Sequence, residues 1–291
     1  MSEHPKAFGE SLTGRDRFEA DAARYADYLE TFEGRLRLDL AWANLRWLIG
    51  EAGLGNKPAG GECGGEQSEA RGRRALDVGG GTGAMALRLA AEGWDVVVLD
   101  SSAGMLALAA EAARGTQFAG RVTFRQADAA RIGDLFPRGS FDAALCHNVL
   151  EYLDDECAVV KGMSAAVRPG GVVSVLARAR AGEAMRAALK SHDLDAARRA
   201  LTARQVSESL YGGAVRLFDA PALLALAEEA ALEVLAERGV RVLADYLPPA
   251  LRATAQDYAR LLAFELELGA RSDFAAVARY TQILARRVGG W

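Results

Sequence analysis

The sequence has few cysteines and histidines, and neither type is spaced as in a metal site. Three of each are scattered along the 291 residues: Cys63, Cys146, Cys157, His4, His147 and His192. Zinc sites need ligand pairs at short spacing, so we expect no metal site. An odd and small number of cysteines also fits a reducing cytoplasm better than a disulfide-bonded secreted protein.

Long hydrophobic runs are missing as well. No stretch of about 18 uncharged apolar residues occurs, so we expect no transmembrane helix and no membrane partner. Residues 1–6 have no apolar core of the kind that a signal peptide needs. The net charge of −4 excludes a uniformly basic nucleic-acid-binding protein. Most basic residues are arginines, however, and a local arginine-rich face for RNA stays open.

The most informative stretch is an apolar segment that runs into a glycine turn. It reads Leu76-Asp77-Val78-Gly79-Gly80-Gly81-Thr82-Gly83 and is followed by a helical pattern at 84–92. Glycines let the backbone approach a ligand closely, and a helix N-terminus offers free N–H groups. The next apolar run ends at Asp100, whose carboxylate can accept hydrogen bonds from both hydroxyls of a ribose. Together these features predict a site for a nucleotide-like ligand.

Two ligands fit this loop. Gly79-x-Gly81-x-x-Ala84 satisfies the loose dinucleotide fingerprint, which would make the protein an NAD-dependent oxidoreductase. Asp77 favours the second ligand, because Asp-x-Gly-x-Gly-x-Gly resembles motif I of the class I S-adenosylmethionine (SAM) methyltransferases. In that family the acidic residue orients the loop and, indirectly, the amino-acid end of SAM. The resemblance implies SAM as cofactor and S-adenosylhomocysteine as product.

Strand and helix patterns alternate along the rest of the chain. Strands are predicted at 75–78, 95–99, 122–126, 141–146 and 171–177. Helices are predicted between them at 84–92, 103–113, 130–136 and 154–167. A helix to about 231, a strand at 232–242, a helix at 252–269 and a strand at 277–287 follow. The alternation predicts an α/β, Rossmann-like fold with a seven-stranded, mostly parallel sheet whose last strand is antiparallel.

Three other segments extend this domain. Residues 1–53 form a tail and a helical cap, with the helical pattern starting near residue 15. Residues 54–74 are rich in glycine and charge, and we interpret them as a mobile insertion. The methyltransferase domain then spans 75–291. Within it, the arginine- and alanine-rich residues 179–213 predict a helical lid over the ligand.

Residues that follow the second and third strands match family positions. The resemblance implies that Asp100 binds the ribose hydroxyls and that Ser101 and Met105 lie near the adenine and ribose. Met105 alternatively belongs to the helix core. After the third strand, the carboxylate of Asp128 would accept from the adenine amino group, with the backbone N–H of Ala129 beside the ring. The alternative for Asp128 is a helix N-cap.

His147 follows the fourth strand. Ligands of doubly wound folds bind at the carboxyl ends of the strands, so we expect His147 to contact cofactor or substrate rather than act as a general base. Glu151 and Tyr152 lie about one turn further on and are interpreted as supporting residues.

A closer resemblance is to the bacterial tRNA methyltransferases that methylate the carboxylate of 5-carboxymethoxyuridine. The matching segments are Gly34-Arg35-Leu36-Arg37 with Trp42, 76–83, 147–152, 239–242 with 245–247, and, more weakly, 278–280 with 285–287. This likeness implies tRNA as the partner. It also implies that Arg37 contacts the carboxylate of SAM, and that Gly79, Gly80 and Gly81 lie along its amino-acid part.

The identity of the methyl acceptor stays open. The insertion at 54–74 is extra, 179–213 is only weakly alike, and Leu243-Ala244 stand where the family has a basic residue. A small-molecule carboxylate or hydroxyl is the main alternative to tRNA, and a non-catalytic SAM-binding protein is another. A carboxylate acceptor needs no general base but needs a cation, for which the candidates are Arg178, Arg180, Arg216 and Arg241. An amine or phenol acceptor would need a base, first His147 or Tyr246.

Overall fold

The structure is a computed structural model that describes residues 22–55, 72–207 and 213–289. Its centre is a seven-stranded sheet in the order β3-β2-β1-β4-β5-β9-β8. The strands are β1 (Arg74–Val78), β2 (Asp95–Asp100), β3 (Val122–Gln126), β4 (Phe141–His147), β5 (Val167–Arg178), β8 (Leu232–Val240) and β9 (Tyr280–Arg287).

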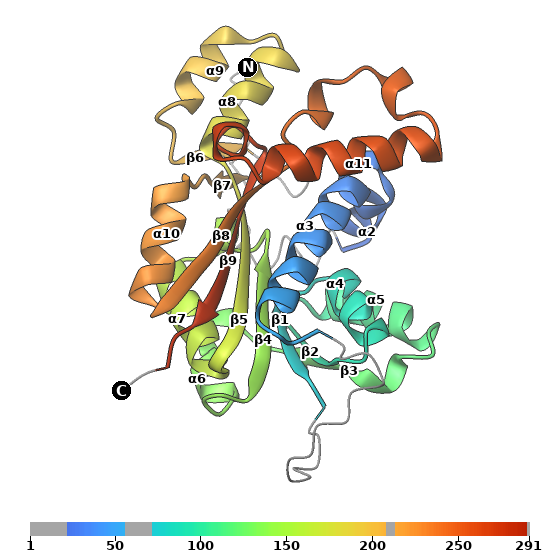
Figure 1. Cartoon of the computed structure of the whole chain (residues 1–291), viewed down its shortest axis with the longest axis vertical. Coiled ribbons are helices and arrows are strands. Elements are labelled where there is room, and N and C mark those ends of the chain that lie inside the picture. The colour runs from blue at the N-terminus through green and yellow to red at the C-terminus, as the bar shows by residue number, and fades with distance from the viewer. Residues whose placement is uncertain (1–21, 56–71, 208–212, 290–291) are drawn as a thin grey trace, which may run out of the picture.

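One strand of this sheet runs against the others. Strands β1 to β5 pair in parallel, whereas β9 is antiparallel to both β5 and β8. The last strand of the sequence therefore lies between two earlier ones (Figure 1). The predicted Rossmann-like fold, with its mostly parallel sheet and antiparallel final strand, is confirmed.

Helices cover both faces of the sheet (Figure 1). One face carries α3 (Phe32–Glu51), α4 (Ala84–Ala91) and α5 (Ala103–Arg114). The other carries α6 (Ile132–Leu135), α7 (Glu156–Ala166) and α10 (Ala220–Glu229). Each face buries its own cluster, with Leu45 and Leu89 on the first and Met163 and Leu223 on the second. Burial on both faces explains why the strands read as nearly continuous apolar runs.

The remaining helices gather beyond the carboxyl ends of the parallel strands, at the top of Figure 1. They are α2 (Ala22–Glu30), α8 (Arg180–Leu189), α9 (Leu194–Ala200), α11 (Ala255–Gly269) and α12 (Ser272–Ala275). Short 3-10 turns complete the chain: η1 (Ala119–Arg121), η2 (Ala129–Arg131), η3 (Leu150–Tyr152), η4 (Ala244–Tyr246) and η5 (Pro249–Arg252). This end of the sheet is therefore enclosed by segments from many parts of the sequence.

Several predicted element boundaries were wrong. The helical pattern near 15–53 is two helices in the described part, because Thr31 ends α2 and caps α3 by accepting a hydrogen bond from Gly34 N. The helix at 130–136 is the turn η2 followed by the single turn α6. Strand β5 begins at Val167 rather than 171, since Val167 already pairs with Phe141 before an irregularity in register.

A small hairpin was not predicted at all. Strands β6 (Gln205–Ser207) and β7 (Ala214–Arg216) pair with each other outside the main sheet. They lie after α8 and α9, in the segment for which a lid is predicted, and the lid role stays a prediction. Residues 1–21 of the predicted tail and 56–71 of the predicted insertion lie outside the described residues.

No helix within 22–55, 72–207 or 213–289 is long and apolar enough to cross a membrane. The same residues contain no group of three or more His, Cys, Asp or Glu side chains that could hold a metal ion.

Gly182 allows α8 to lie directly on the segment that leads into β9. A Cβ atom at Gly182 would lie 2.2 Å from the carbonyl oxygen of Ala278 and 2.6 Å from the Cα of Arg279. Both contacts are with backbone, so we expect Gly182→Ala to lower the free energy of unfolding by about 1–3 kcal/mol. Urea denaturation of the purified variant measures this change.

Gly50→Ala is the matched control in α3. No atom lies within 4 Å of a Cβ built at Gly50, and Ala favours a helix interior over Gly by roughly 0.5–1 kcal/mol. This variant should be as stable as the wild type or slightly more so. Equal stability of the two alanine variants would show that α8 does not pack against Ala278 as described.

Candidate functional site

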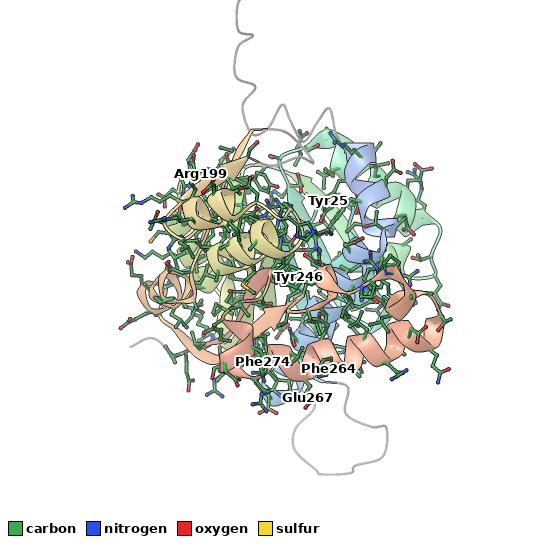
Figure 2. The ribbon with its side chains drawn as sticks, turned by 90° about the horizontal axis from the view of Figure 1, so that it is seen from above. Tyr25, Arg199, Tyr246, Phe264, Glu267 and Phe274 are labelled. Atoms are coloured by element: carbon green, nitrogen blue, oxygen red, sulfur yellow. The ribbon has the colours of Figure 1, made fainter. Side chains whose placement is uncertain are left out.

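A cavity of about 1110 Å³ opens at the carboxyl ends of the strands. Figure 2 looks onto this end, with Tyr25 of α2 on one side, Arg199 of α9 on the other and Tyr246 between them. Nine of the eleven residues predicted for the cofactor line the cavity: Arg37, Gly79, Gly81, Asp100, Ser101, Met105, Asp128, Ala129 and His147. Asp77 and Gly80 are not in its lining.

The glycine loop needs its glycines for two different reasons. Gly79, Gly81 and Gly83 have φ angles of 62°, 55° and 76°, in the left-handed region that favours glycine. A Cβ atom at Gly79 would also lie 2.4 Å from Cγ2 of Val149, and one at Gly80 would lie 2.9 Å from the carboxyl carbon of Asp77. The loop therefore packs tightly on its protein side while its other side faces the cavity.

Asp77 lies behind this loop, on the side away from the cavity. Its side chain is buried and accepts a hydrogen bond from the backbone N–H of Ala86, while its Oδ2 atom has no partner among the described residues. Burial, and to a lesser extent the nearby carboxylate of Asp100, raises the pKa of Asp77 to about 7. A buried carboxyl group of this kind changes charge near neutral pH.

Asp100 is held between the loop and the start of α5. Its Oδ2 accepts from the N–H of Gly81 and its Oδ1 from the N–H of Ser102, both at 2.9 Å. Two backbone donors fix the carboxylate at the edge of the cavity, where a ribose would meet it. Met105, on α5, is buried and also lines the cavity, so its two interpretations are compatible.

Asp128 is a helix N-cap, as its alternative interpretation predicted. Its Oδ1 accepts from the N–H of Ala130 at 2.8 Å, so Asp128 caps the turn η2. It also lines the cavity together with Ala129, and the predicted contact with adenine stays a prediction.

His147 ends β4 and begins a buried chain of hydrogen bonds that the sequence did not reveal. Its Nε2 lies 2.8 Å from Oγ of Ser174, and Ser174 accepts from Nε2 of Gln282 at 3.0 Å. The Gln282 amide also receives a hydrogen bond from Asn44 on α3. The Ser174 hydroxyl can both donate and accept, so it can hold the His147 ring in either neutral tautomer. Burial lowers the pKa of His147 to about 3, with a smaller contribution from Arg37, and the ring is neutral.

One part of the cavity lining is rich in guanidinium groups and begins close to the glycine loop, since a Cβ atom at Gly81 would lie 3.5 Å from the ring of Tyr25. Arg37 is buried, donates to the hydroxyl of Tyr25 at 3.0 Å, and lies over the ring of Tyr28 at 5.0 Å. No carboxylate pairs with Arg37 in the part of the chain that the structure describes. Arg178, Arg241, Arg279 and Tyr280 also line the cavity, but only the first two were considered as site residues from the sequence.

The other two candidate cations have structural partners and do not line the cavity. Arg180 pairs with Asp219 at 2.6 Å, and Arg216 pairs with Glu156. Glu151 and Tyr152 do line it. Glu151 supports the site by accepting from the N–H of Arg178 at 2.7 Å, while its other oxygen has no partner among the described residues.

Two bulky residues of the cavity lining have a left-handed backbone. Asn148, just after β4, has φ 57°, and Arg241, just after β8, has φ 61°. Such a conformation is costly for Arg and is stabilised here by its surroundings, since Arg241 pairs with Asp245 and its carbonyl accepts from Arg279 N. The geometry places both side chains at the cavity.

The cavity fits an adenosyl cofactor. Two buried polar atoms of its lining residues have no partner among the described residues, namely Glu151 Oε2 and His147 Nδ1. A ligand with amino, hydroxyl and carboxylate groups has donors and acceptors for both. The volume also exceeds the roughly 300–1,000 Å³ usual for one small ligand, which leaves room for an acceptor.

Sequence comparison leads to the same class of enzyme. Residues 75–171 match the family model described as a methyltransferase domain. A tRNA 5-carboxymethoxyuridine methyltransferase of Escherichia coli (strain K12) is 26% identical over 88% of this chain and 90% of its own length. A ubiquinone biosynthesis O-methyltransferase of Methylococcus capsulatus is 36% identical, but over only 35% of this chain and 42% of its own length.

Solved structures share the fold. A [4+2]-cyclase, SpnF, has a TM-score of 0.57 at 18% identity and covers 96% of this chain and 98% of its own. An S-adenosylmethionine-dependent methyltransferase from Mesorhizobium loti has a TM-score of 0.50 at 19% identity, over 76% of this chain and 94% of its own. At these identities the likeness establishes the fold alone.

The raised pKa of Asp77 makes stability depend on pH. Its folded pKa of about 7 exceeds the unfolded value near 3.9, so its contribution is complete below pH 4 and is lost as the pH rises through 7. Between pH 5 and 8 the wild type should lose roughly 3 kcal/mol of unfolding free energy that Asp77→Asn retains. Urea denaturation of both ligand-free proteins at the two pH values measures the difference, and parallel pH profiles would contradict it.

Ser174 should affect cofactor binding through His147. Ser174→Ala removes the hydrogen-bond partner that holds the His147 ring in place, and we expect SAM affinity to fall by roughly fivefold to tenfold. Isothermal titration calorimetry measures this loss. Ser164→Ala, at a buried serine of α7 outside the cavity lining, is the control and should bind SAM normally. Equal affinities in all three proteins would remove His147 from the cofactor site.

The family match, the relatives and the fold all agree with a cavity suited to an adenosyl group. They rule out the NAD-dependent oxidoreductase that the glycine fingerprint alone had left open. Residues 75–171 match a methyltransferase domain, and the chain is similar to class I SAM-dependent methyltransferases.

Proposed function

We propose that this methyltransferase transfers the methyl group of SAM to a carboxylate oxygen of 5-carboxymethoxyuridine in tRNA. The observation that carries the proposal is the cluster of guanidinium groups in the cavity lining, in which Arg37 has no carboxylate partner among the described residues. The Escherichia coli relative that is named for this reaction supports it, because its similarity extends over 88% of the chain.

The ion pairs among these residues do not give every guanidinium group a carboxylate of its own. Arg241 has Asp245 to itself, but Arg279 and Arg186 share the single carboxylate of Glu183. Arg37 has tyrosines around it and no carboxylate partner among the described residues. Positive charge out of bulk water favours anionic ligands, and an acceptor carboxylate is one.

The site residues also suit an acceptor that is already ionised. SAM supplies a methyl group activated by a positively charged sulfur. The protein has to align acceptor and donor and exclude water, and a carboxylate acceptor needs no base at neutral pH. His147 is neutral, and its pKa of about 3 makes it a poor general base at neutral pH. Burial and then Asp245 raise the pKa of Tyr246 to about 12, and Tyr246 is not in the cavity lining.

The cavity rim supports an RNA partner. Arg186 and Lys190 of α8 line the cavity with 37% and 44% of their side chains exposed. Exposed Arg198 and Arg199 continue this basic surface on α9 (Figure 2). Phosphates can compete for such solvent-exposed cations, so tRNA methylation should weaken as salt increases. An enzyme acting on tRNA works in the cytoplasm, the compartment that the sparse cysteines predict.

A small-molecule acceptor is the second candidate. The local similarity to a ubiquinone biosynthesis O-methyltransferase favours it, but that similarity covers only 35% of this chain. A metabolite enzyme would methylate a carboxylate or hydroxyl compound without any polynucleotide.

The direct test is methyl transfer from labelled SAM into bulk bacterial tRNA from cells that lack this methylation. Nucleoside mass spectrometry should find a methyl ester on 5-carboxymethoxyuridine. The reaction should also slow steeply with added salt, because phosphate contacts release counterions.

SAM binding by the same preparation is the control, measured by calorimetry. Intact binding with no label in tRNA would overturn the tRNA proposal and direct the search to small metabolites. Label on another nucleoside would reject the carboxylate acceptor while keeping an RNA substrate.

A further inference from the structure

The ring of Tyr280 is the point around which the guanidinium groups of the cavity gather. Tyr280 is the first residue of β9, is only 4% exposed, and lines the cavity. The central guanidinium carbons of three arginines lie 5.8, 5.8 and 5.9 Å from its ring centre. They belong to Arg37, Arg241 and Arg279.

The sheet register brings these groups together. Tyr280 pairs with Val240 at the end of β8, directly before Arg241, and with Arg178 at the end of β5. Arg279 precedes it in the chain, and Arg37 reaches it from α3. Four segments that are distant in sequence therefore deliver cations to one aromatic side chain.

The anions in this cluster are shared unevenly. Arg279 shares the carboxylate of Glu183 with Arg186, whereas Arg241 pairs with Asp245 and also interacts with the charge of Glu33. Arg37 has no carboxylate partner among the described residues, and the carboxylate that the family resemblance assigns to it would be one anion. Because its own carboxylate partner is shared, Arg279 is suited to bind a second anion in the same cavity.

The hydroxyl of Tyr280 is available to such an anion. Among the described residues it makes no hydrogen bond, although the neighbouring tyrosines Tyr25 and Tyr28 both receive one from an arginine. A phenolic O–H beside several guanidinium groups is a good donor to a carboxylate.

We propose that Tyr280 and Arg279 form the binding site for the carboxylate of the methyl acceptor, with the Tyr280 hydroxyl donating a hydrogen bond to it. The assignment rests on the proposed function, since it requires a carboxylate acceptor. Arg37 is thereby left for the cofactor.

The charge on Tyr280 then responds to the acceptor. Burial alone would raise the pKa of Tyr280, but nearby guanidinium groups lower it to about 7. These groups belong to Arg241, Arg37, Arg279 and Arg178. A bound carboxylate offsets their charge and disfavours the phenolate, so the pKa of Tyr280 rises and a proton is taken up above pH 7.

The other ionisable groups that face the ring come from several elements. They are Tyr28 on α2, Glu183 on α8 behind Arg279, and Asp245 in η4 behind Arg241. Both carboxylates are held by ion pairs, and the charge of Arg279 lowers the pKa of Glu183 despite its burial. Tyr28 stays neutral there, because burial raises its pKa.

The kinetic test compares Tyr280→Phe with the wild type on tRNA that carries 5-carboxymethoxyuridine. Loss of one hydrogen bond to a charged group should raise KM for tRNA by roughly tenfold to a hundredfold. The dissociation constant of SAM should stay unchanged. Tyr246→Phe is the matched control, because Tyr246 is close in space to the cluster but outside the cavity lining, and it should behave as the wild type.

The spectroscopic test follows tyrosinate absorbance against pH with S-adenosylhomocysteine bound. Adding the nucleoside 5-carboxymethoxyuridine should move the midpoint of one tyrosine upward by about one pH unit or more. Uridine, which lacks the carboxylate, should leave the midpoint in place. Tyr280→Phe should lack this transition altogether.

The outcomes separate the two proposals. A wild type that forms no methyl ester on tRNA overturns the proposed function and, with it, this site. Methyl ester formation with an unchanged KM and an unmoved midpoint in the tests above overturns the role of Tyr280 alone. A weaker SAM affinity in Tyr280→Phe, with KM for tRNA unchanged, would assign Tyr280 to the cofactor instead.

Discussion

A guanidinium group that leaves bulk water needs anions or aromatic faces around it, and this requirement organises the carboxyl end of the sheet. The rings of Tyr25 and Tyr28 lie against Arg37. Arg241 pairs with Asp245, and Arg279 pairs with Glu183. These partners come from helices α2 and α8 and from the turn η4. The same contacts that satisfy the buried cations therefore tie the helices beyond the sheet to its strands, and only a small surplus of charge remains for ligands.

The cavity combines two kinds of chemistry as a result. Asp100, held by two backbone N–H groups, offers a carboxylate to the hydroxyls of a nucleoside. Arg37, Arg241, Arg279 and Tyr280 offer positive charge and an aromatic ring. The neutral ring of His147 lines the same cavity and is held by Ser174 and Gln282. In the proposed reaction, a nucleoside-bearing donor and an anionic acceptor would each find a partner of fitting charge.

The sequence predicted the nucleotide-binding segments well, because those segments are built from local patterns. Strand, glycine turn and helix follow each other within about thirty residues, and Asp100 marks the next strand end. Local patterns could not reveal the places of Tyr280 and Arg279 in the cavity. Nor could they reveal the hydrogen bond between Ser174 and Gln282. These residues enter the site through pairing of β9 with β5 and β8, between residues far apart in sequence. Element ends were missed where tertiary contacts decided them, as at Thr31 and Val167.

The placement of β9 also has a consequence for the order of folding. Strand β5 pairs Val172 with Arg286, more than a hundred residues later, whereas β1 pairs with β2 about twenty residues away. Loop closure over such a distance is slow, so we infer that the nucleotide half forms first on a chain emerging from the ribosome. The cation cluster is completed last, when β9 inserts between its neighbours. The nascent protein would thus be able to hold its cofactor before it can hold an acceptor.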